Sequence, residues 1–441
     1  MACVVITSVL LWLPKSATAK QKTRNANQQI ILKGARIYPA PGVPPIKNGT
    51  VVIENGKIAA IRSSDVVHFK LRPHAREINC EGKTILAGFW NSHIHFTEPK
   101  WQNASTLPAG QLSSQLQDML TRYGFTSVVD TASITSNTVA LRARIERGEI
   151  PGPQILTAGL PLYPENGIPY YVLESIPPDV VKLMKQPATP EEAVQAVDDD
   201  IAQGADIIKL FVVSWVSRNG RHVPLPMRLD IVQAAVNEAH RKGKLVFAHP
   251  STIEGVELVL KGHVDVLAHT IEGPADWTPD VVLRLKAANV SLIPTLALFN
   301  SPTEINEGIL HEVKSYADAG GTILFGTDIG YLTNYADLTR EFALLKRAGL
   351  TFPQILASLT TAPAERLGFA KTTGRLAKGM DADLAILDGD PAQDIMALSR
   401  VNTTIRKGKI IYESRRHYSM RSLLFDKRNL KNIRPQLACN E

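Results

Sequence analysis

The sequence predicts an α/β fold in which a (β/α)8 TIM barrel is joined to a small β-sandwich domain formed from both chain ends. Eight short apolar segments alternate with helical segments within residues 84–372, and this is the count that such a barrel requires. Stretches of alternating apolar and polar residues flank that region at 29–83 and 373–413, where we expect the sandwich. A chain of 441 residues is long enough for both units.

The sandwich is predicted from short strands that are separated by turn residues. The first two are "QIILKGARIYP" and "GTVVIENGKIAAI", and the second contains Asn55-Gly56, a dipeptide that favours a two-residue hairpin turn. The same pattern returns near the other end of the chain in "GMDADLAILDGD" and "VNTTIRKGKIIYE". Strands from both ends are therefore expected to lie in one small domain.

The barrel strands are expected where apolar segments are bounded by turn residues, and helices such as 228–242 and 279–288 separate several of them. An open, doubly wound sheet is the alternative fold, but no glycine-rich phosphate loop opens the unit. We place the strands at 84–96, 126–131, 153–159, 206–213, 244–250, 264–270, 291–297 and 322–328.

Residues 1–19 are predicted to be a cleaved signal peptide. An apolar run that ends at Leu13 is too short to span a bilayer, and Ala17-Thr18-Ala19 fits a small-residue cleavage site. The mature chain would begin near Lys20, be secreted or periplasmic, and contain no integral membrane segment. Because no Lys or Arg precedes the run, an uncleaved interfacial anchor and a misassigned start codon stay open as alternatives.

Charge and cysteine content argue against two classes of protein. Residues 1–28 carry +4 and the basic C-terminal extension 414–441 carries +5, which leaves about −2 for residues 29–413 and gives nucleic-acid binding no support. The three cysteines, Cys3, Cys80 and Cys439, are too few for a disulfide framework. A Cys80–Cys439 bridge stays open.

Metal-binding side chains fall at the carboxyl ends of four predicted strands, where barrels of this kind place their reactive groups. Two histidines at positions i and i+2 of the first strand project from the same face. Each motif alone is weak, because histidines that line a barrel are often satisfied by hydrogen bonds. Together they form a nitrogen and oxygen ligand set that divalent transition metals prefer. The residues are His93, His95, His249, His269 and Asp328.

Lys209 is a cation inside the apolar run "IIKLFVV". A buried ammonium group there needs a partner or a lowered pKa. Carboxylation by CO₂ would convert the amine into a carbamate, whose two oxygens and negative charge could bridge two metal ions. An unmodified Lys209 paired with Asp328 is an equally open alternative.

As a set, these motifs resemble the amidohydrolase superfamily of metal-dependent hydrolases, with its imidazolonepropionase-like and prolidase-like members. The matching stretches are "SHIH", "IIKLF", "FAHP", "LAHT", "GTDIG" and the returning "TTAPAERLGF" and "GRLAKGMDADLAILD". The resemblance covers roughly residues 29–413. "LAGFWNSHIH" departs from it, since Ala87 and Asn91 stand where the family usually has Pro-Gly and an acidic residue.

The resemblance implies a site with two divalent metal ions, of which zinc is the first choice and manganese and cobalt are alternatives. His93 and His95 would hold the first ion together with Asp328, the other two histidines would hold the second ion, and an N6-carboxylated Lys209 would bridge the two. A hydroxide between the ions would attack the substrate, and Asp328 would move its proton to the leaving nitrogen.

Loops beyond the strand ends are expected to determine which substrate binds. Segment 161–186 is long and rich in Pro and Tyr, as many lids are, and it contains Tyr163. The loop after the fourth strand contains Trp215 and two arginines, either of which would receive a substrate carboxylate. The substrate-binding candidates are Glu98, Tyr170, Tyr171, Arg218, Arg221, His222 and Tyr331.

The predicted function is hydrolysis of C–N bonds in amides, cyclic amides or dipeptides by a metal-bridging hydroxide. The substrate is a small molecule, and homo-oligomers are left open. A one-metal deaminase or lactonase on the same fold is the first alternative, and Lys209 argues against it because one ion needs no bridge. A non-catalytic extracellular binding protein is the second alternative, since fold alone does not establish activity.

Overall fold

The computed structural model describes residues 29–63, 72–335 and 338–414. The predicted signal peptide, nearly all of the basic extension and Cys439 lie outside the described residues, so the proposed Cys80–Cys439 bridge stays a prediction. Cys80 itself is buried and is not in a disulfide. No helix in the described ranges combines the length and apolar character needed to span a membrane.

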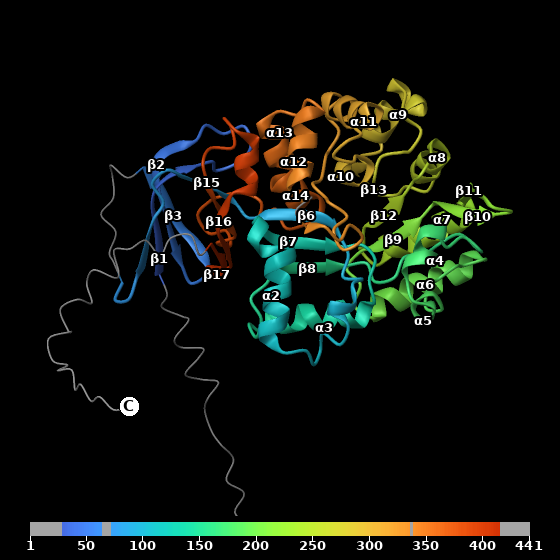
Figure 1. Cartoon of the computed structure of the whole chain (residues 1–441), viewed down its shortest axis with the longest axis horizontal. Coiled ribbons are helices and arrows are strands. Elements are labelled where there is room, and N and C mark those ends of the chain that lie inside the picture. The colour runs from blue at the N-terminus through green and yellow to red at the C-terminus, as the bar shows by residue number, and fades with distance from the viewer. Residues whose placement is uncertain (1–28, 64–71, 336–337, 415–441) are drawn as a thin grey trace, which may run out of the picture.

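Strands from both ends of the chain are hydrogen-bonded into one continuous eight-stranded sheet at one side of the molecule (Figure 1). Its order is β17-β16-β15-β5-β1-β2-β3, and β4 pairs with β1. Asn55 and Gly56, with φ of 51° and 79°, join β2 to β3 and confirm the predicted hairpin turn. The strands are β1 (Gln29–Ile37), β2 (Ile46–Glu54), β3 (Lys57–Ser63), β4 (Arg76–Asn79), β5 (Lys83–Ala87), β15 (Leu384–Asp388), β16 (Val401–Arg406) and β17 (Lys409–Glu413).

Two parallel sheets occupy the middle of the molecule, in the orders β6-β7-β8 and β14-β13-β12-β9 (Figure 1). Their strands are buried along nearly their whole length, as expected for sheets that are covered on both faces. A separate hairpin consists of β10 (Val213–Arg218) and β11 (Arg221–Pro226). The parallel strands are β6 (Phe89–Ile94), β7 (Phe125–Asp130), β8 (Gln154–Thr157), β9 (Ile208–Phe211), β12 (Val246–His249), β13 (Val266–Ala268) and β14 (Ser291–Ile293).

Four of the predicted strands are wrong in detail. Segment 206–213 holds β9 but also the first residue of β10, and segment 291–297 holds β14 but also the start of α10. Segment 84–96 is not one strand: β5 belongs to the mixed sheet and β6 to a parallel one, and the break falls at Gly88. A Cβ at Gly88 would lie 2.3 Å from Thr126 Oγ1, so only glycine fits this close approach of two chains. Segment 322–328 is not a regular strand, because its only ladder contact is an isolated bridge between Leu292 and Ile323.

Segment 322–328 nevertheless lies between the two parallel sheets. The Leu324 N–H donates to the Leu292 carbonyl of β14, and the Asp328 N–H donates to the His93 carbonyl of β6, each at 2.9 Å. On the opposite side, the Leu162 N–H donates to the Lys209 carbonyl of β9, also at 2.9 Å. The hydrogen-bonded ladders thus form two open sheets rather than one closed barrel, and a few backbone hydrogen bonds and isolated bridges span the gaps between them.

Helices cover the parallel sheets, and those predicted at 228–242 and 279–288 are confirmed as α7 and α9. In α7, the buried residues Ile231, Val232, Ala235 and Val236 recur at the spacing that puts them on one face. The helices are α2 (Ala109–Met119), α3 (Thr135–Glu146), α4 (Tyr170–Ser175), α5 (Pro178–Val181), α6 (Pro190–Ala202), α7 (Leu229–Arg241), α8 (Ile253–Lys261), α9 (Pro279–Ala287), α10 (Leu296–Phe299), α11 (Glu307–Asp318), α12 (Leu338–Arg347), α13 (Phe352–Leu359) and α14 (Thr361–Arg366), with 3-10 turns η2 (Pro99–Trp101), η3 (Thr121–Tyr123), η4 (Pro274–Asp276) and η6 (Ile395–Ser399).

Phe325 lies at the centre of the large core and anchors segment 322–328. Its ring is fully buried, with centroids 5.9 Å from Phe125 of β7 and 5.1 Å from Phe342 of α12. The same residue receives a backbone hydrogen bond from Ser92 of β6. Phe325 therefore holds the segment that ends in Asp328 against both a strand and a helix.

Phe325→Ala is expected to lower the free energy of unfolding by about 3–5 kcal/mol, because it removes a buried ring and leaves a cavity. Urea denaturation would measure the change. Leu283→Ala is the control, since Leu283 is 59% exposed and its loss should cost little. A similar cost for both variants would contradict the assigned core.

Candidate metal centre

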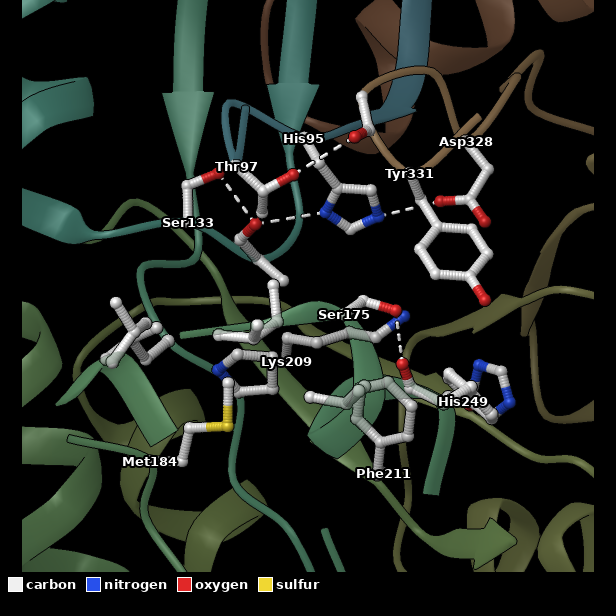
Figure 2. A pocket seen from close by; sticks show the side chains of 18 of the residues that line it. His95, Thr97, Ser133, Ser175, Met184, Lys209, Phe211, His249, Asp328 and Tyr331 are labelled. Atoms are coloured by element: carbon white, nitrogen blue, oxygen red, sulfur yellow. Dashed lines mark hydrogen bonds and ion pairs between the residues drawn. The ribbon is translucent and has the colours of Figure 1, made fainter. Parts of the chain in front are cut away.

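The six predicted metal-ligand residues line one cavity of about 900 Å³. Parallel strands share one direction, so their carboxyl ends meet on the same side of the molecule. In Figure 2, His95 and Asp328 face each other across a short gap, and Lys209 and His249 lie on the other side of the cavity. The residues brought together are His93, His95, Lys209, His249, His269 and Asp328.

Asp328 holds two imidazoles through one carboxylate oxygen. Its Oδ1 lies 2.7 Å from His95 Nε2 and 3.2 Å from His93 Nε2, and the possible ligand atoms of these three residues all lie within 4.8 Å of one another. Burial alone would raise the pKa of Asp328, but the two imidazoles hold that pKa well below its usual range. Burial lowers the pKa of His93 to about 3, although Asp328 opposes the shift. The site therefore favours an ionised carboxylate beside a neutral His93 imidazole, which is the form that binds a metal ion.

The rings of His249 and His269 are fixed by different contacts. His249 stacks on Phe211, with ring centroids 4.6 Å apart. Thr295 Oγ1 donates to the Pro294 carbonyl, so it accepts a hydrogen bond from His269 Nδ1 at 2.6 Å. Nδ1 of His269 then carries the proton, and its Nε2 keeps a lone pair. Burial holds the pKa of both histidines well below the ordinary value, so both rings are neutral.

Lys209 is buried with its amine unpaired. Its Nζ has no hydrogen bond among the described residues and lies 5.5 Å from the ring centroid of Phe211. The alternative of a direct Lys209–Asp328 ion pair is therefore not seen. Burial lowers the pKa of Lys209 to about 7, with Asp328 opposing the shift.

The backbone is strained where the site residues leave their strands. His269, Asp328 and Thr295 have φ of 94°, 60° and 45°, a region that residues with side chains rarely adopt. Such conformations cost of order 1–3 kcal/mol each and persist where the surroundings enforce them. The sequence gives no sign of this strain, because none of the three positions is a glycine or an asparagine.

Two buried glutamates hold the loops beside His269. Glu341 of α12 accepts hydrogen bonds from the Leu296 and Ala297 N–H groups, both at 2.8 Å, directly after Thr295. Glu312 of α11 accepts one from the Ile271 N–H at 3.1 Å. Both carboxyl groups are fully buried, and burial raises the pKa of Glu341 to about 7 and that of Glu312 to about 8. Sequence reasoning missed both, although an acidic residue on the apolar face of a helix was a visible signal.

Asn91, which departs from the usual first motif, joins two parts of the site. Its Nδ2 donates to Thr327 Oγ1 at 2.7 Å, and its Oδ1 accepts from the His93 N–H at 3.3 Å. The side chain is fully buried. Asn91 thus ties β6 to the segment that carries Asp328, a role for which a neutral donor and acceptor is suited.

Most of the predicted substrate-binding residues line the cavity, namely Glu98, Tyr170, Tyr171, His222 and Tyr331. The two predicted arginines do not. Arg218 and Arg221 stand opposite each other beside the turn of the β10–β11 hairpin and are exposed, whereas Trp215 and His222 of the same hairpin line the cavity. Sequence reasoning did not find Glu272, which also lines the cavity and follows His269 by three residues.

The residues present fit a divalent ion. Three buried nitrogens, His93 Nδ1, His249 Nδ1 and Lys209 Nζ, have no hydrogen-bond partner within the described part of the chain. An unpaired buried polar group costs about 1–3 kcal/mol, so such a cluster calls for a ligand. Imidazole nitrogens with a carboxylate are a donor set that zinc and similar ions prefer.

Histidines and an aspartate gathered at the ends of parallel strands are what a metal-dependent hydrolase requires. The amidohydrolase family profile matches residues 84–411, and the chain belongs to this family. It is therefore a hydrolase that acts on carbon–nitrogen bonds, not a non-catalytic binding protein.

The chain is similar to several known proteins along most of its length. Ochratoxinase from Aspergillus niger is 26% identical over 438 residues, covering 89% of this chain and 88% of the relative. Imidazolonepropionase from Thermoplasma acidophilum is 23% identical and covers 84% and 91% of the two chains. The crystal structure of a Xaa-Pro dipeptidase with bound methionine has a TM-score of 0.71 at 21% identity and covers 88% and 100%.

Glu312→Gln is expected to become more stable relative to the parent protein as pH rises from about 4.5 to about 8. In that window the unfolded carboxyl group has lost its proton and the folded one has kept it, so each pH unit costs the parent up to about 1 kcal/mol. Urea unfolding at pH 5 and pH 8 would measure the difference. Glu307→Gln, an exposed position on the same helix, is the control. An equal effect at both pH values would show that Glu312 is ionised in the fold.

Proposed function

We propose that this chain hydrolyses amide bonds of small molecules, including cyclic amides and dipeptides, at the cavity around Asp328. The observation that carries the proposal is the Asp328 carboxylate. Its Oδ1 lies 2.7 Å from His95 Nε2 and 3.2 Å from His93 Nε2, so one buried carboxylate oxygen meets both imidazoles. Membership of the amidohydrolase family supports the reaction class, and the names of the ochratoxinase and Xaa-Pro dipeptidase relatives support amide-type substrates.

We infer that two divalent ions, zinc first, bind between the two sides of the cavity. His93, His95 and Asp328 would hold one ion, and His249 with His269 the other. Ions bound there would lower the pKa of a water molecule and polarise the substrate carbonyl. The two open sheets and segment 322–328 would then be parts of one (β/α)8 barrel, which the backbone hydrogen bonds across both gaps support.

Lys209 is proposed to bridge the ions as a carbamate. Its neutral amine would add to CO₂, which forms an N–C bond, and would release one proton. The proposal is supported by the buried Nζ, which has no hydrogen-bond partner among the described residues. The same cavity is lined by the five other candidate metal ligands. A carbamate would give that position two acceptor oxygens in place of an unpaired amine.

The residues of the chain itself account for proton transfer and orientation. Asp328 would accept a proton at Oδ2 from the attacking water and deliver it to the leaving nitrogen. Phe211 lies against both His249 and Tyr163, with ring centroids 4.6 Å and 4.7 Å apart, and covers one wall of the cavity with apolar surface. That apolar wall would exclude water from one side of a bound substrate.

A one-metal deaminase or lactonase on the same fold is the second candidate. One observation favours it: among the described residues, only His93, His95 and Asp328 bring their ligand atoms within 4.8 Å of one another. Metal content separates the candidates, because the first requires two tightly held ions per chain and the second requires one.

Export from the cytoplasm and self-association both stay predictions. The signal peptide proposed at residues 1–19 lies outside the described residues, and the basic extension 414–441 lies there except for Ser414.

Asp328→Asn is expected to lower kcat/KM on an amide panel by about 10²–10⁴-fold, because the amide side chain cannot take up and pass on a proton. The panel of aryl amides, cyclic amides and dipeptides would be run on zinc-loaded protein with bicarbonate present. Asp179→Asn is the control, since this carboxylate on α5 is exposed and does not line the cavity. Failure of the parent protein on the whole panel would refute the proposed function.

Lys209→Met is expected to reduce bound metal from two ions per chain to one or none, because the substitution removes the proposed bridge but keeps the apolar stem. Elemental analysis would measure the metal content, and ¹³C-bicarbonate labelling would give a carbamate NMR signal in the parent only. Lys286→Met, an exposed lysine on α9, is the control. Two ions retained by Lys209→Met would contradict the bridge.

A further inference from the structure

The cavity wall is poor in positive charge. Among the described residues that line it there is no arginine, and Lys209 is the single lysine. Lys209 is buried beside Phe211 and the metal-ligand histidines, so its amine belongs to the proposed metal site. The wall therefore presents no cation of its own to a substrate outside that site.

Three carboxylates line the same cavity, and two of them are already compensated. Asp328 faces the imidazoles of His93 and His95. Glu98 lies 3.0 Å from Lys100 Nζ and also accepts a hydrogen bond from Tyr335. Neither group requires a charge from a substrate.

Glu272 is the exception. Its Oε1 accepts a hydrogen bond from Trp215 Nε1 at 2.8 Å, but within the described part of the chain it has no ion pair. Partial burial raises the pKa of Glu272, and no neighbouring cation opposes that shift. A partly desolvated carboxylate of this kind is stabilised by a cation that comes within hydrogen-bonding or charge-pairing distance.

Aromatic rings accompany Glu272 along the cavity. Tyr171 lines the cavity together with Glu272, and burial, more than any neighbouring charge, raises its pKa well above the ordinary value. The ring centroid of Tyr171 lies 5.4 Å from Tyr170 and 6.0 Å from Tyr331, and Tyr331 projects beside Asp328 in Figure 2. Tyr170, Tyr171 and Tyr331 thus form a row of neighbouring aromatic rings in the cavity that Glu272 and Trp215 also line.

We propose that Glu272, together with Trp215 and this tyrosine row, binds an ammonium group of the substrate, so that the enzyme selects cationic amides over carboxylate-bearing ones. The proposal rests on the proposed amide hydrolysis and names its substrate class. Aromatic faces attract organic cations through their ring quadrupoles, and a nearby carboxylate strengthens that attraction. A substrate carboxylate would instead meet an unpaired Glu272, and the exposed Arg218 and Arg221 lie outside the cavity.

Three matched aryl amides that differ only in one terminal group test the selectivity. The group is trimethylammonium, its neutral isostere tert-butyl, or carboxylate, and the measurement is kcat/KM on zinc-loaded protein. We expect the cation to exceed the tert-butyl compound by about fivefold and the carboxylate to be the poorest. Glu272→Gln should bring the first two within about twofold. Equal values for these two in the parent would overturn the inference while leaving amide hydrolysis established.

If none of the three amides is cleaved, that result counts against the proposed function alone. The cation preference is then tested by measuring the binding of a cation and its neutral isostere directly. Calorimetry would compare 3-hydroxyphenyl-trimethylammonium with 3-tert-butylphenol, since a quaternary nitrogen has no lone pair and cannot ligate a metal ion. We expect the parent to bind the cation about fivefold more tightly and Glu272→Gln to lose that preference. Glu174→Gln, an exposed carboxylate on α4 that does not line the cavity, should keep it. A preference that survives Glu272→Gln, or is absent from the parent, overturns the inference.

Discussion

The contact of one Asp328 oxygen with two imidazoles is the interaction on which the rest of the site depends. It places an ionised carboxylate in the buried interior, where charge is costly unless it is compensated. Contacts of the surrounding residues keep the carboxylate in that position. Phe325 anchors the segment that carries Asp328, and Asn91 ties the same segment to the strand of His93. The left-handed backbone at Asp328 turns its side chain into the cavity and is maintained by these contacts.

Much of the fold, and the gathering of the six candidate ligand residues around one cavity, could be predicted from the sequence, because the signals are local. His93 and His95 share a strand face by their spacing alone, and Lys209 stands out because its neighbours are apolar. Most of the features that the sequence did not predict depend on contacts between residues that are far apart in the chain. The break at Gly88 follows from the approach of Thr126, which is 38 positions away in the chain. Arg218 and Arg221 lie outside the cavity because the Asn219-Gly220 turn places them at the tip of the β10–β11 hairpin. Glu341 was missed because its partners are backbone amides on a distant loop.

The two halves of the site are oriented by different means, and this matters for catalysis. On one side the imidazoles of His93 and His95 meet a charged oxygen, which is a strong and directional contact. On the other side His249 rests on an aromatic ring and His269 on a threonine hydroxyl, with Glu341 and Glu312 holding the loops beyond. The first side therefore has a carboxylate in contact with its imidazoles, whereas on the second side the carboxylates act through the backbone. The Asp328 carboxylate on the first side is available as a proton acceptor. The contacts on the second side fix the orientation of the His249 and His269 rings.

The passage of the chain through Gly88 has a consequence for how the two ends of the protein act together. β5 is an inner strand of the mixed sheet, paired with β1 on one side and with β15 on the other, and one residue later the chain enters β6 and reaches His93. Strand β15, from the C-terminal part of the described chain, thus holds β5, which leads directly into the strand that carries His93. Loss of β15–β17, by truncation or by proteolysis, would expose an edge of β5 and remove that contact, although none of the three strands touches the cavity. Strands β15–β17 therefore support the position of β6, and with it the two histidines, from outside the cavity.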